Sequence, residues 1–185
     1  MAKMDVCPWW LGYLLACPIR NLFENPDKRL SPYLRPGMTV LDIGCAMGFF
    51  TIPAARMVGG KGRVIAVDLQ PKMIDALKRR LKRRGLLDRV DARVCGKTDL
   101  GIGDLDGRID FVLAIHVVHE VPDKGRLFAE LFRSLRPGGQ LLFAEPKGHV
   151  SADELDQSVA EAIKAGFIVT PADGVTGHSR LLSRP

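Results

Sequence analysis

The stretch that decides the fold reads VLDIGCAMGFFT and occupies residues 40–51. It opens with a short, largely apolar run of strand length, then passes through small residues into a helical pattern at Phe50, Ala54 and Met57. Small residues let the backbone approach a ligand closely, and a helix that starts there supplies unpaired N–H groups. The acid within the run, Asp42, can accept a hydrogen bond or balance a cation. The stretch therefore predicts a strand, a ligand-binding turn and a helix in direct succession.

Four more runs of strand length follow along the chain. They are continuously apolar rather than alternating, which is typical of strands buried on both faces of a parallel sheet. Helical patterns separate the runs, so the order of elements predicts a doubly wound α/β fold with right-handed crossovers. The five predicted strands are Thr39–Ile43, Val64–Val67, Ala92–Cys95, Ile109–Ile115 and Leu141–Ala144.

Apolar residues four positions apart predict two later helices, whose apolar faces are expected to pack on the core. The two sets are Leu127, Leu131 and Leu135, followed by Leu155, Val159 and Ile163. The first set predicts a helix over residues 123–136. The Pro-Gly-Gly sequence at residues 137–139 is expected to end this helix and to turn the chain into the next strand.

Length and composition fit one globular domain. The chain has 185 residues, of which 46% are hydrophobic and 26% charged, so it can bury a core without a disulfide or a metal. Its longest apolar stretch, within residues 111–118, is too short to span a bilayer. Both tryptophans and both tyrosines fall in residues 1–36, together with five prolines. We therefore divide the chain into an N-terminal helical lid segment over residues 1–36 and one domain over residues 37–185, although the first segment could also serve only as packing.

The net charge of +6 is concentrated in one segment. Residues 72–84 carry seven cations against a single acid, Asp75. The apolar residues of the segment recur at helical spacing, so its cations are expected on the solvent-exposed face of a helix. The alternative is a contact with nucleic acid or a membrane surface.

The cysteines lack the spacing of a metal site, and they are Cys7, Cys17, Cys45 and Cys95. The last two adjoin predicted strands, where reduced thiols are commonly buried, so a reducing cytoplasm is expected. Residues 14–17 are similar to a lipoprotein cleavage box. The region before them lacks the continuous apolar run and the strong basic start of a signal peptide.

A second motif, VIAVDL at residues 64–69, ends a predicted strand in Asp68. A carboxylate at this place can accept hydrogen bonds from two adjacent ribose hydroxyls, as in nucleotide-binding α/β folds. The alternative is a surface aspartate that caps the helix beginning at Pro71. The dinucleotide fingerprint G-x-G-x-x-G is absent, since its later glycine positions hold Ala46 and Phe49.

Together these motifs resemble those of the class I S-adenosylmethionine-dependent methyltransferases, in their ubiquinone/menaquinone-biosynthesis-like branch. The first motif of that family is an acid with glycines at alternate positions, as at residues 42–48, where Ala46 replaces the middle glycine. The ribose-binding acid of the family matches Asp68. The further matches are IDFVLA at 109–114, VHEVPD at 118–123 and LRPGGQLL at 135–142.

The resemblance covers about residues 36–182 and implies a Rossmann-like sheet of seven strands in a single domain. Phe167–Thr170 and Ser179–Leu182 would form its C-terminal antiparallel hairpin. The implied cofactor is S-adenosyl-L-methionine, and no metal is implied. The implied cofactor-binding residues are Asp42, Gly44, Cys45, Ala46, Gly48, Asp68, Leu69, Met73, Gly96, Lys97, Ala114 and His116.

Two positions depart from the pattern of the family. The methyl group of Ala46 is tolerable in the turn where the φ angle of the residue is negative. After the third strand the family often has an acid that binds the adenine amino group, and Gly96 occupies this position here. Adenine contact is therefore expected from backbone groups or from Asp99.

Ionisable residues follow the fourth and fifth predicted strands, at the sheet edge where ligands of such folds bind. His119 and Glu120 are the catalytic candidates, with Glu120 expected to face the ligand as a base and His119 beside it. Glu145 and His149 are expected at the same edge. The alternatives are a structural role and a metal site, which lacks a third ligand at a recognisable spacing.

These features predict in-line methyl transfer to a small molecule held under the 1–36 segment. With so little chain beyond the core fold, we expect no recognition domain for a macromolecule. The Asn-Pro-Pro-Tyr motif of base-amine methylation is absent after the fourth predicted strand. Two alternatives remain, an RNA-modifying methyltransferase that uses the basic segment and a non-catalytic protein that binds S-adenosylmethionine.

Overall fold

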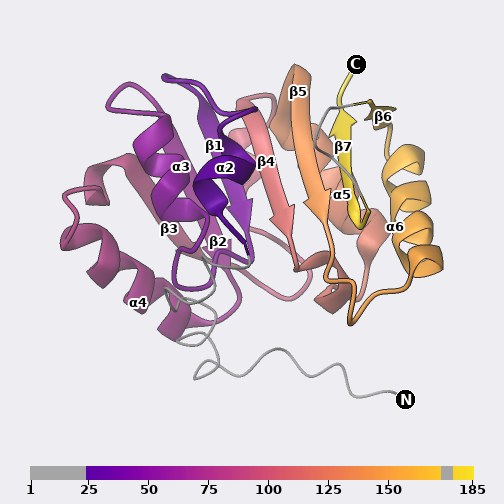
Figure 1. Ribbon diagram of the computed structural model, residues 1–185, viewed down its shortest axis with the longest axis horizontal. Coiled ribbons are helices and arrows are strands. Elements are labelled where there is room, and N and C mark those ends of the chain that lie inside the picture. The colour runs from indigo at the N-terminus through magenta and orange to yellow at the C-terminus, as the bar shows by residue number, and fades with distance from the viewer. Residues whose placement is uncertain (1–23, 172–176) are drawn as a thin grey trace. The chain divides into compact units, whose positions relative to one another are not determined.

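The computed structural model describes residues 24–171 and 177–185. They form two compact units, one ending at Cys95 and one beginning at Gly96. Figure 1 colours the elements of the first unit from indigo to magenta and those of the second from pink to yellow. Of the proposed lid segment, residues 1–23 lie outside the described part, so its role as a lid stays a prediction. Residues 24–36 contain one short helix, α2 (Pro26–Leu30).

Three parallel strands form the sheet of the first unit. In it, β2 (Arg63–Asp68) pairs on one side with β1 (Thr39–Ile43) and on the other with β3 (Val90–Val94). The buried strands β1 and β2 match the apolar runs of the sequence. β3 begins two residues earlier than predicted, because its polar residues Asp91 and Arg93 alternate with apolar ones and hide it from a search for continuous runs.

Helices follow the first two strands of this unit. α3 (Thr51–Met57) comes after the turn that ends β1, and α2 packs against it (Figure 1). α4 (Pro71–Lys82) begins at the predicted proline. It buries its apolar residues on one face, as their spacing predicts, and these are Met73, Ile74, Ala76, Leu77 and Leu81.

The second unit contains four strands in the order β4-β5-β7-β6. β4 (Ile109–Ile115) has the predicted bounds and pairs in parallel with β5 (Leu135–Ala144). β7 (Ser179–Ser183) runs antiparallel to both β5 and β6 (Ile168–Thr170). The predicted C-terminal antiparallel hairpin is confirmed.

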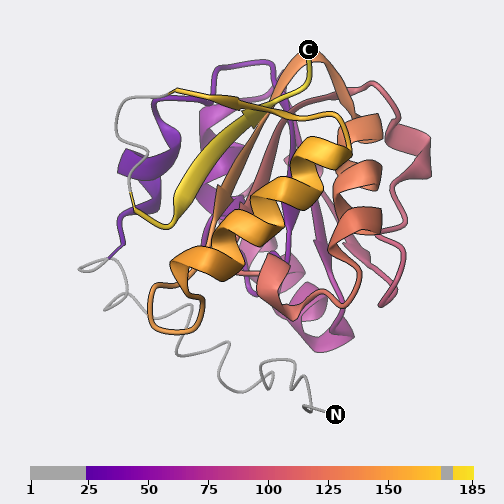
Figure 2. The same cartoon turned by 90° about the vertical axis from the view of Figure 1, so that its right-hand side faces the viewer.

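Two helices of the second unit, α5 (Lys124–Ser134) and α6 (Ala152–Lys164), lie side by side (Figure 2). The ring of Phe128, a residue of α5, meets the rings of Phe143 and Phe167 edge-on, with centroids 5.8 Å and 6.3 Å away. Across residues 24–171 and 177–185, no helix is both long and apolar enough to cross a membrane. The short 3-10 turns of the two units are η2 (Leu87–Arg89), η3 (Gly103–Leu105) and η4 (Val118–Glu120).

The end of α5 differs from the prediction. The helix stops at Ser134 and β5 begins at once, so the Pro-Gly-Gly sequence lies inside the strand rather than before it. Leu135 already pairs with Ile109, and the register then shifts before Phe111 pairs with Gln140. Pairing with β4, which local sequence does not report, decides where the strand begins.

The apolar stripe of α6 also departs from the prediction at one position. Ile163 is 52% exposed, whereas Ala162 is fully buried. At 3.6 residues per turn, a residue eight positions after Leu155 lies about 80° around the helix from it, and one seven positions after lies within about 20°. The buried face therefore passes through position 162 rather than 163.

Candidate active site

The turn between β1 and α3 is built on left-handed backbone. Gly44, Ala46 and Gly48 have φ angles of 66°, 45° and 87°. The turn is tied down where the Cys45 N–H donates to the Val67 carbonyl of β2 at 3.1 Å, and where the Gly48 N–H donates to the Cys45 carbonyl at 2.9 Å. Glycine adopts such angles without steric cost, which explains the alternate spacing of small residues in the motif.

Ala46 does not have the negative φ under which its methyl group was expected to be tolerable. A left-handed backbone costs an L residue about 1–2 kcal/mol, because Cβ crowds the following carbonyl. The Ala46 N–H donates to Oδ2 of Asp68 at 2.9 Å, and its side chain packs against the buried residues Met47, Met73 and Ala76. These contacts hold the strained residue in place, so the turn accepts alanine at a cost in strain.

Gly48 is required by helix packing. A Cβ at this position would lie 2.5 Å from Cδ1 of Leu77 and 3.3 Å from Cγ1 of Ile52. Leu77 is fully buried in α4, so its side chain has little room to move away. The sequence interpretation assigned this glycine to close approach of a ligand, whereas the structure shows that α3 and α4 already need it.

Asp68 ends β2 with its carboxylate held by two backbone amides. Oδ2 accepts the N–H of Ala46 at 2.9 Å, and Oδ1 accepts the N–H of Gln70, the residue before α4, at 2.8 Å. Only 8% of the residue is exposed, so the alternative of a surface aspartate is wrong. Burial raises the pKa of Asp68, and the two amide hydrogen bonds oppose that shift. Each carboxylate oxygen has a second lone pair, so the group can accept from two further donors.

Asp42 is the second buried acid of the first unit and is 3% exposed. Its Oδ2 accepts a hydrogen bond from Oγ1 of Thr51, the first residue of α3, at 2.6 Å. Burial raises the pKa of Asp42 to about 7, helped by the charge of Asp68 and opposed by the Thr51 hydrogen bond. A cation bound beside this carboxyl would favour its charged form.

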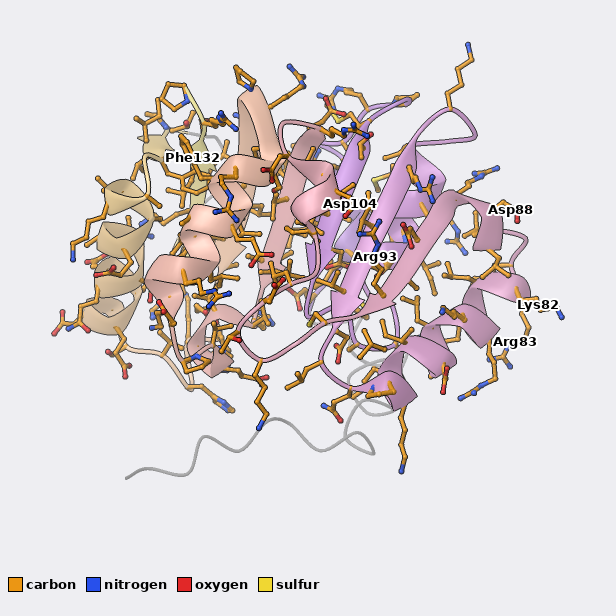
Figure 3. The ribbon with its side chains drawn as sticks, turned by 180° about the vertical axis from the view of Figure 1, so that it is seen from behind. Lys82, Arg83, Asp88, Arg93, Asp104 and Phe132 are labelled. Carbon is orange, nitrogen blue, oxygen red and sulfur yellow. The ribbon has the colours of Figure 1, made fainter. Side chains whose placement is uncertain are left out.

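One cation of the basic segment holds the turn. Nη1 of Arg80 donates to the Met47 carbonyl at 2.6 Å. Burial, reinforced by the neighbouring charges of Arg84 and Arg83, lowers the pKa of Arg80. The other six cations of residues 72–84 are exposed as predicted, and Lys82 and Arg83 point away from the sheet of this unit in Figure 3.

In the second unit, the predicted adenine contacts lie in an exposed turn after β3. The Gly96 N–H donates to the Asp99 carbonyl at 2.9 Å, and Oδ1 of Asp99 accepts the Gly101 N–H at 2.6 Å. Lys97 is exposed in the same turn. The turn is thus closed by its own backbone, and its amide and carboxylate groups lie at the surface.

Two further predicted cofactor-binding residues, Ala114 and His116, lie near the end of β4 and differ in how deeply they are buried. Ala114 is fully buried in the strand. His116, half-buried just beyond it, has a φ angle of 60° and donates its N–H to the Ala144 carbonyl at 2.8 Å. The chain therefore leaves the sheet at His116 and enters η4.

The catalytic candidate His119 is bound to Glu145. Nδ1 of its ring lies 2.6 Å from Oε2 of Glu145, and the backbone N–H of His119 donates to Oε1 at 2.9 Å. The hydrogen bond with Glu145 is the largest cause that raises the pKa of His119, and the charges of Glu145 and Glu120 add to it. Burial and Lys124 act in the opposite direction. The His149 ring stands edge-on to His119, with centroids 6.4 Å apart.

Glu120 is half-buried in η4, and its expected orientation toward a ligand stays a prediction. Within the described ranges, no group of three His, Cys, Asp or Glu residues is arranged to hold a metal ion. Sequence reasoning missed Thr51 and Arg80. Thr51 had a usable signal, since a hydroxyl residue begins a helix shortly after a buried acid. Arg80 had none, because it was one cation among seven.

Comparison with known proteins places this geometry in a family. The family described as "Methyltransferase domain" matches residues 40–139. The arsenite methyltransferase of Halobacterium salinarum is 34% identical over 112 residues, which are 60% of this chain and 28% of that protein. The ubiquinone/menaquinone biosynthesis C-methyltransferase UbiE of Hydrogenovibrio crunogenus is 32% identical over 127 residues, or 69% of this chain and 49% of that protein. The chain thus spans half or less of the length of these two relatives.

A solved structure extends the likeness to nearly the whole fold. The SAM-dependent methyltransferase from Aquifex aeolicus has a TM-score of 0.83 and 24% identity to this chain, covering 96% of this chain and 98% of its own. This agreement confirms the predicted Rossmann-like α/β fold, and the family match covers more than half of the chain. The chain belongs to the class I methyltransferases, whose cofactor is S-adenosylmethionine.

Proposed function

We propose that this protein transfers a methyl group from S-adenosylmethionine to a small molecule by in-line displacement. The arrangement around Asp68 carries the proposal. Its buried carboxylate ends a parallel strand beside a left-handed turn, and both oxygens keep acceptor capacity after binding a backbone amide. Two adjacent hydroxyls, such as those of a ribose, can donate to such a carboxylate together.

The donor set of the first unit also suits the charged end of the cofactor. S-adenosylmethionine carries an ammonium group, and a carboxyl with a pKa of about 7 gains charge when a cation binds next to it. We therefore assign the ammonium to Asp42, the ribose to Asp68 and the adenine to the turn at residues 96–99. Met73 would support the site indirectly, by packing against Ala46. The other proposed contacts are Gly44, Cys45, Ala46, Gly48, Leu69, Lys97, Ala114 and His116.

The bound cofactor supplies a methyl group that its sulfonium already activates. The protein must then align the acceptor, exclude water and remove a proton where the acceptor carries one. In this proposal residues 1–36 exclude water, while His119 and Glu120 provide the ionisable groups. The two curated relatives are named for arsenite and for quinone biosynthesis, which supports a small acceptor. The buried thiol of Cys45 forms no disulfide, which supports a reducing cytoplasm as the location of the protein.

Calorimetric titration with S-adenosylmethionine tests the cofactor assignment. Asp68→Ala should raise the dissociation constant on the order of 30-fold or more, because two charge-assisted hydrogen bonds are lost. Asp88→Ala is the control, since Asp88 is an exposed aspartate of η2 in the same unit, and it should leave the constant unchanged. Equal constants for wild type and Asp68→Ala would show that β2 does not end at the ribose.

A second candidate acceptor is RNA, which the exposed cations of α4 favour. Six of the seven cations in residues 72–84 are exposed. If they bind phosphates, affinity for RNA should fall steeply as salt rises. Binding of a random single-stranded RNA measured between about 50 and 200 mM salt, against a Lys82→Ala/Arg83→Ala variant, decides this. Affinity that neither salt nor the substitutions change would remove RNA as a candidate.

A further inference from the structure

Glu145 binds His119 through both of its carboxylate oxygens. Oε2 lies 2.6 Å from Nδ1 of the ring, and Oε1 accepts the backbone N–H at 2.9 Å. One contact fixes the backbone of residue 119, and the other fixes the orientation of its ring. The two residues are 26 positions apart in the chain, so the contact joins the segment after β4 to the end of β5.

The surrounding structure keeps Glu145 in place. Its side chain is 1% exposed, and its N–H donates to the His178 carbonyl at 2.9 Å. The chain turns immediately afterwards, where the His149 N–H donates to the Pro146 carbonyl at 3.0 Å. Because the side chain is buried and the backbone is held both at Glu145 and in the turn after it, the carboxylate has few other positions to adopt. Glu145 is therefore a fixed acceptor for His119.

This contact decides which ring nitrogen of His119 is available. A carboxylate only accepts hydrogen bonds, so Nδ1 carries the proton and Nε2 of the neutral ring keeps its lone pair. A quarter of the His119 side chain remains exposed, which leaves the ring accessible to a bound molecule. Glu145 and Glu120 favour the charged ring, burial and Lys124 oppose it, and the His149 ring packs at its edge.

We infer that His119 removes a proton from the methyl acceptor and that Glu145 is its positioning residue. The inference rests on the proposed function and deepens it. The acceptor atom, X, forms a bond to the methyl carbon while the carbon–sulfur bond breaks and leaves its electron pair on sulfur. The proton of X–H passes to Nε2 of His119. The products are the methylated acceptor, S-adenosylhomocysteine and an imidazolium ion beside the Glu145 carboxylate, which later returns its proton to water.

The pair also indicates the chemical class of the acceptor. A histidine base serves an acceptor whose attacking atom carries a proton acidic enough to transfer near neutral pH, such as the hydroxyl oxygen of a phenol or an enol. An acceptor whose attacking atom has a free lone pair and no proton, such as the arsenic of arsenite, needs no base at that atom. The inference therefore favours an acceptor that loses a proton on methylation, such as a hydroxyarene, over one that attacks with a lone pair alone.

Glu145→Gln tests the role of the positioning residue. The amide oxygen of glutamine can still accept the backbone N–H, but its NH₂ group then faces Nδ1 and favours the ring with Nε2 protonated, which cannot take a proton. In cofactor-free protein, the pKa of His119 followed by NMR should fall by roughly one unit or more, with the signal assigned from His119→Asn. The turnover number for 1,4-dihydroxynaphthalene should fall on the order of 10²-fold, and the acidic limb of its pH profile should move to lower pH.

Three matched measurements accompany this variant. Glu130→Gln makes the same change at a largely buried glutamate of the same unit that accepts the Leu100 N–H at 3.1 Å, and it should alter neither the pKa nor the turnover. Glu120→Gln should lower turnover by about tenfold at most, since Glu120 contributes charge rather than the hydrogen bond. His119→Asn, which does not depend on how glutamine packs at position 145, should lose turnover as Glu145→Gln does.

Failure of the inference and failure of the proposed function give different results. No calorimetric binding of S-adenosylmethionine to the wild type would overturn the proposed function. Where the cofactor binds, an unchanged His119 pKa in Glu145→Gln or turnover within about threefold of wild type would overturn the inference. A 10²-fold loss in Glu120→Gln alone would assign the proton to Glu120 instead. Methylation of arsenite without methylation of 1,4-dihydroxynaphthalene would also overturn the inference, and would leave the proposed function standing.

Discussion

Replacing Gly48 with alanine should destabilise the protein by about 2–4 kcal/mol, although the position lies in a turn. The residue has a φ angle of 87°, and the space where its side chain would stand is filled by Leu77 of α4. The substitution adds one carbon atom and changes no charge. It therefore isolates two physical effects, backbone strain and overpacking.

The magnitude follows from those two effects and one compensation. Left-handed backbone costs an L residue about 1–2 kcal/mol. A Cβ placed 2.5 Å from Cδ1 of Leu77 must displace a fully buried side chain, and overpacking of this kind costs about 1–3 kcal/mol. Alanine also reduces the entropy of the unfolded chain, which returns about 0.4–1 kcal/mol. The sum is smaller than the roughly 5–15 kcal/mol that stabilise a typical domain, so the variant should still fold.

Gly59→Ala is the matched control, because Gly59 has a φ angle of 68° and nothing within 4 Å of the added Cβ. It should cost about 1 kcal/mol or less, since only the strain applies. Urea unfolding followed by circular dichroism gives both free energies. The double variant Gly48→Ala/Leu77→Ala should cost at least about 1 kcal/mol less than the sum of its single variants. If Gly48→Ala and Gly59→Ala lower the free energy of unfolding equally, the packing argument is refuted, and close approach of a ligand remains as the reason for Gly48.

Three further predictions concern other parts of the molecule. Asp42→Asn should stabilise the protein by roughly 2.5 kcal/mol more at pH 8 than at pH 5, because the folded-state pKa of Asp42 is about 7 and the unfolded value is near 3.9. The contribution of this carboxyl to stability is complete below about pH 4 and is lost as pH rises through 7. Urea unfolding measures the difference in unfolding free energy between variant and wild type, and a difference that does not change with pH would contradict the raised pKa of Asp42. A chain that starts near Asn25 should fold and bind S-adenosylmethionine by calorimetry but lose methyl transfer, whereas a much lower melting temperature would make residues 1–24 part of the core. Arg184→Ala should lower the free energy of unfolding by about 1–3 kcal/mol, because Nη1 donates to the carbonyls of Phe132 and Leu135 at 3.0 Å and 2.6 Å and the guanidinium lies 4.8 Å from the Phe132 ring. Urea unfolding unchanged from wild type would show that these contacts do not stabilise the end of α5.

The sequence was sufficient where structure depends on local pattern. β1 and β4 have the predicted bounds, because continuous apolar character is itself the property that places a strand between two layers. The start of α4 at Pro71 and the exposure of most of its cations follow in the same way from spacing along one helix. The positions of Asp42 and Asp68 at strand ends were also predictable, because each acid directly interrupts or closes an apolar run.

Tertiary structure decided the contacts between side chains that are distant in the chain. Arg80 reaches a carbonyl 33 residues away, Glu145 holds a histidine 26 residues away, and Leu77 fills the space beside Gly48. The start of β5 likewise depends on pairing with Ile109 rather than on the Pro-Gly-Gly sequence that follows it. Periodicity reports which face of an element is apolar, but not which residue of another element meets it. The partner of each charged group and the reason for Gly48 therefore became visible only when the elements were packed together.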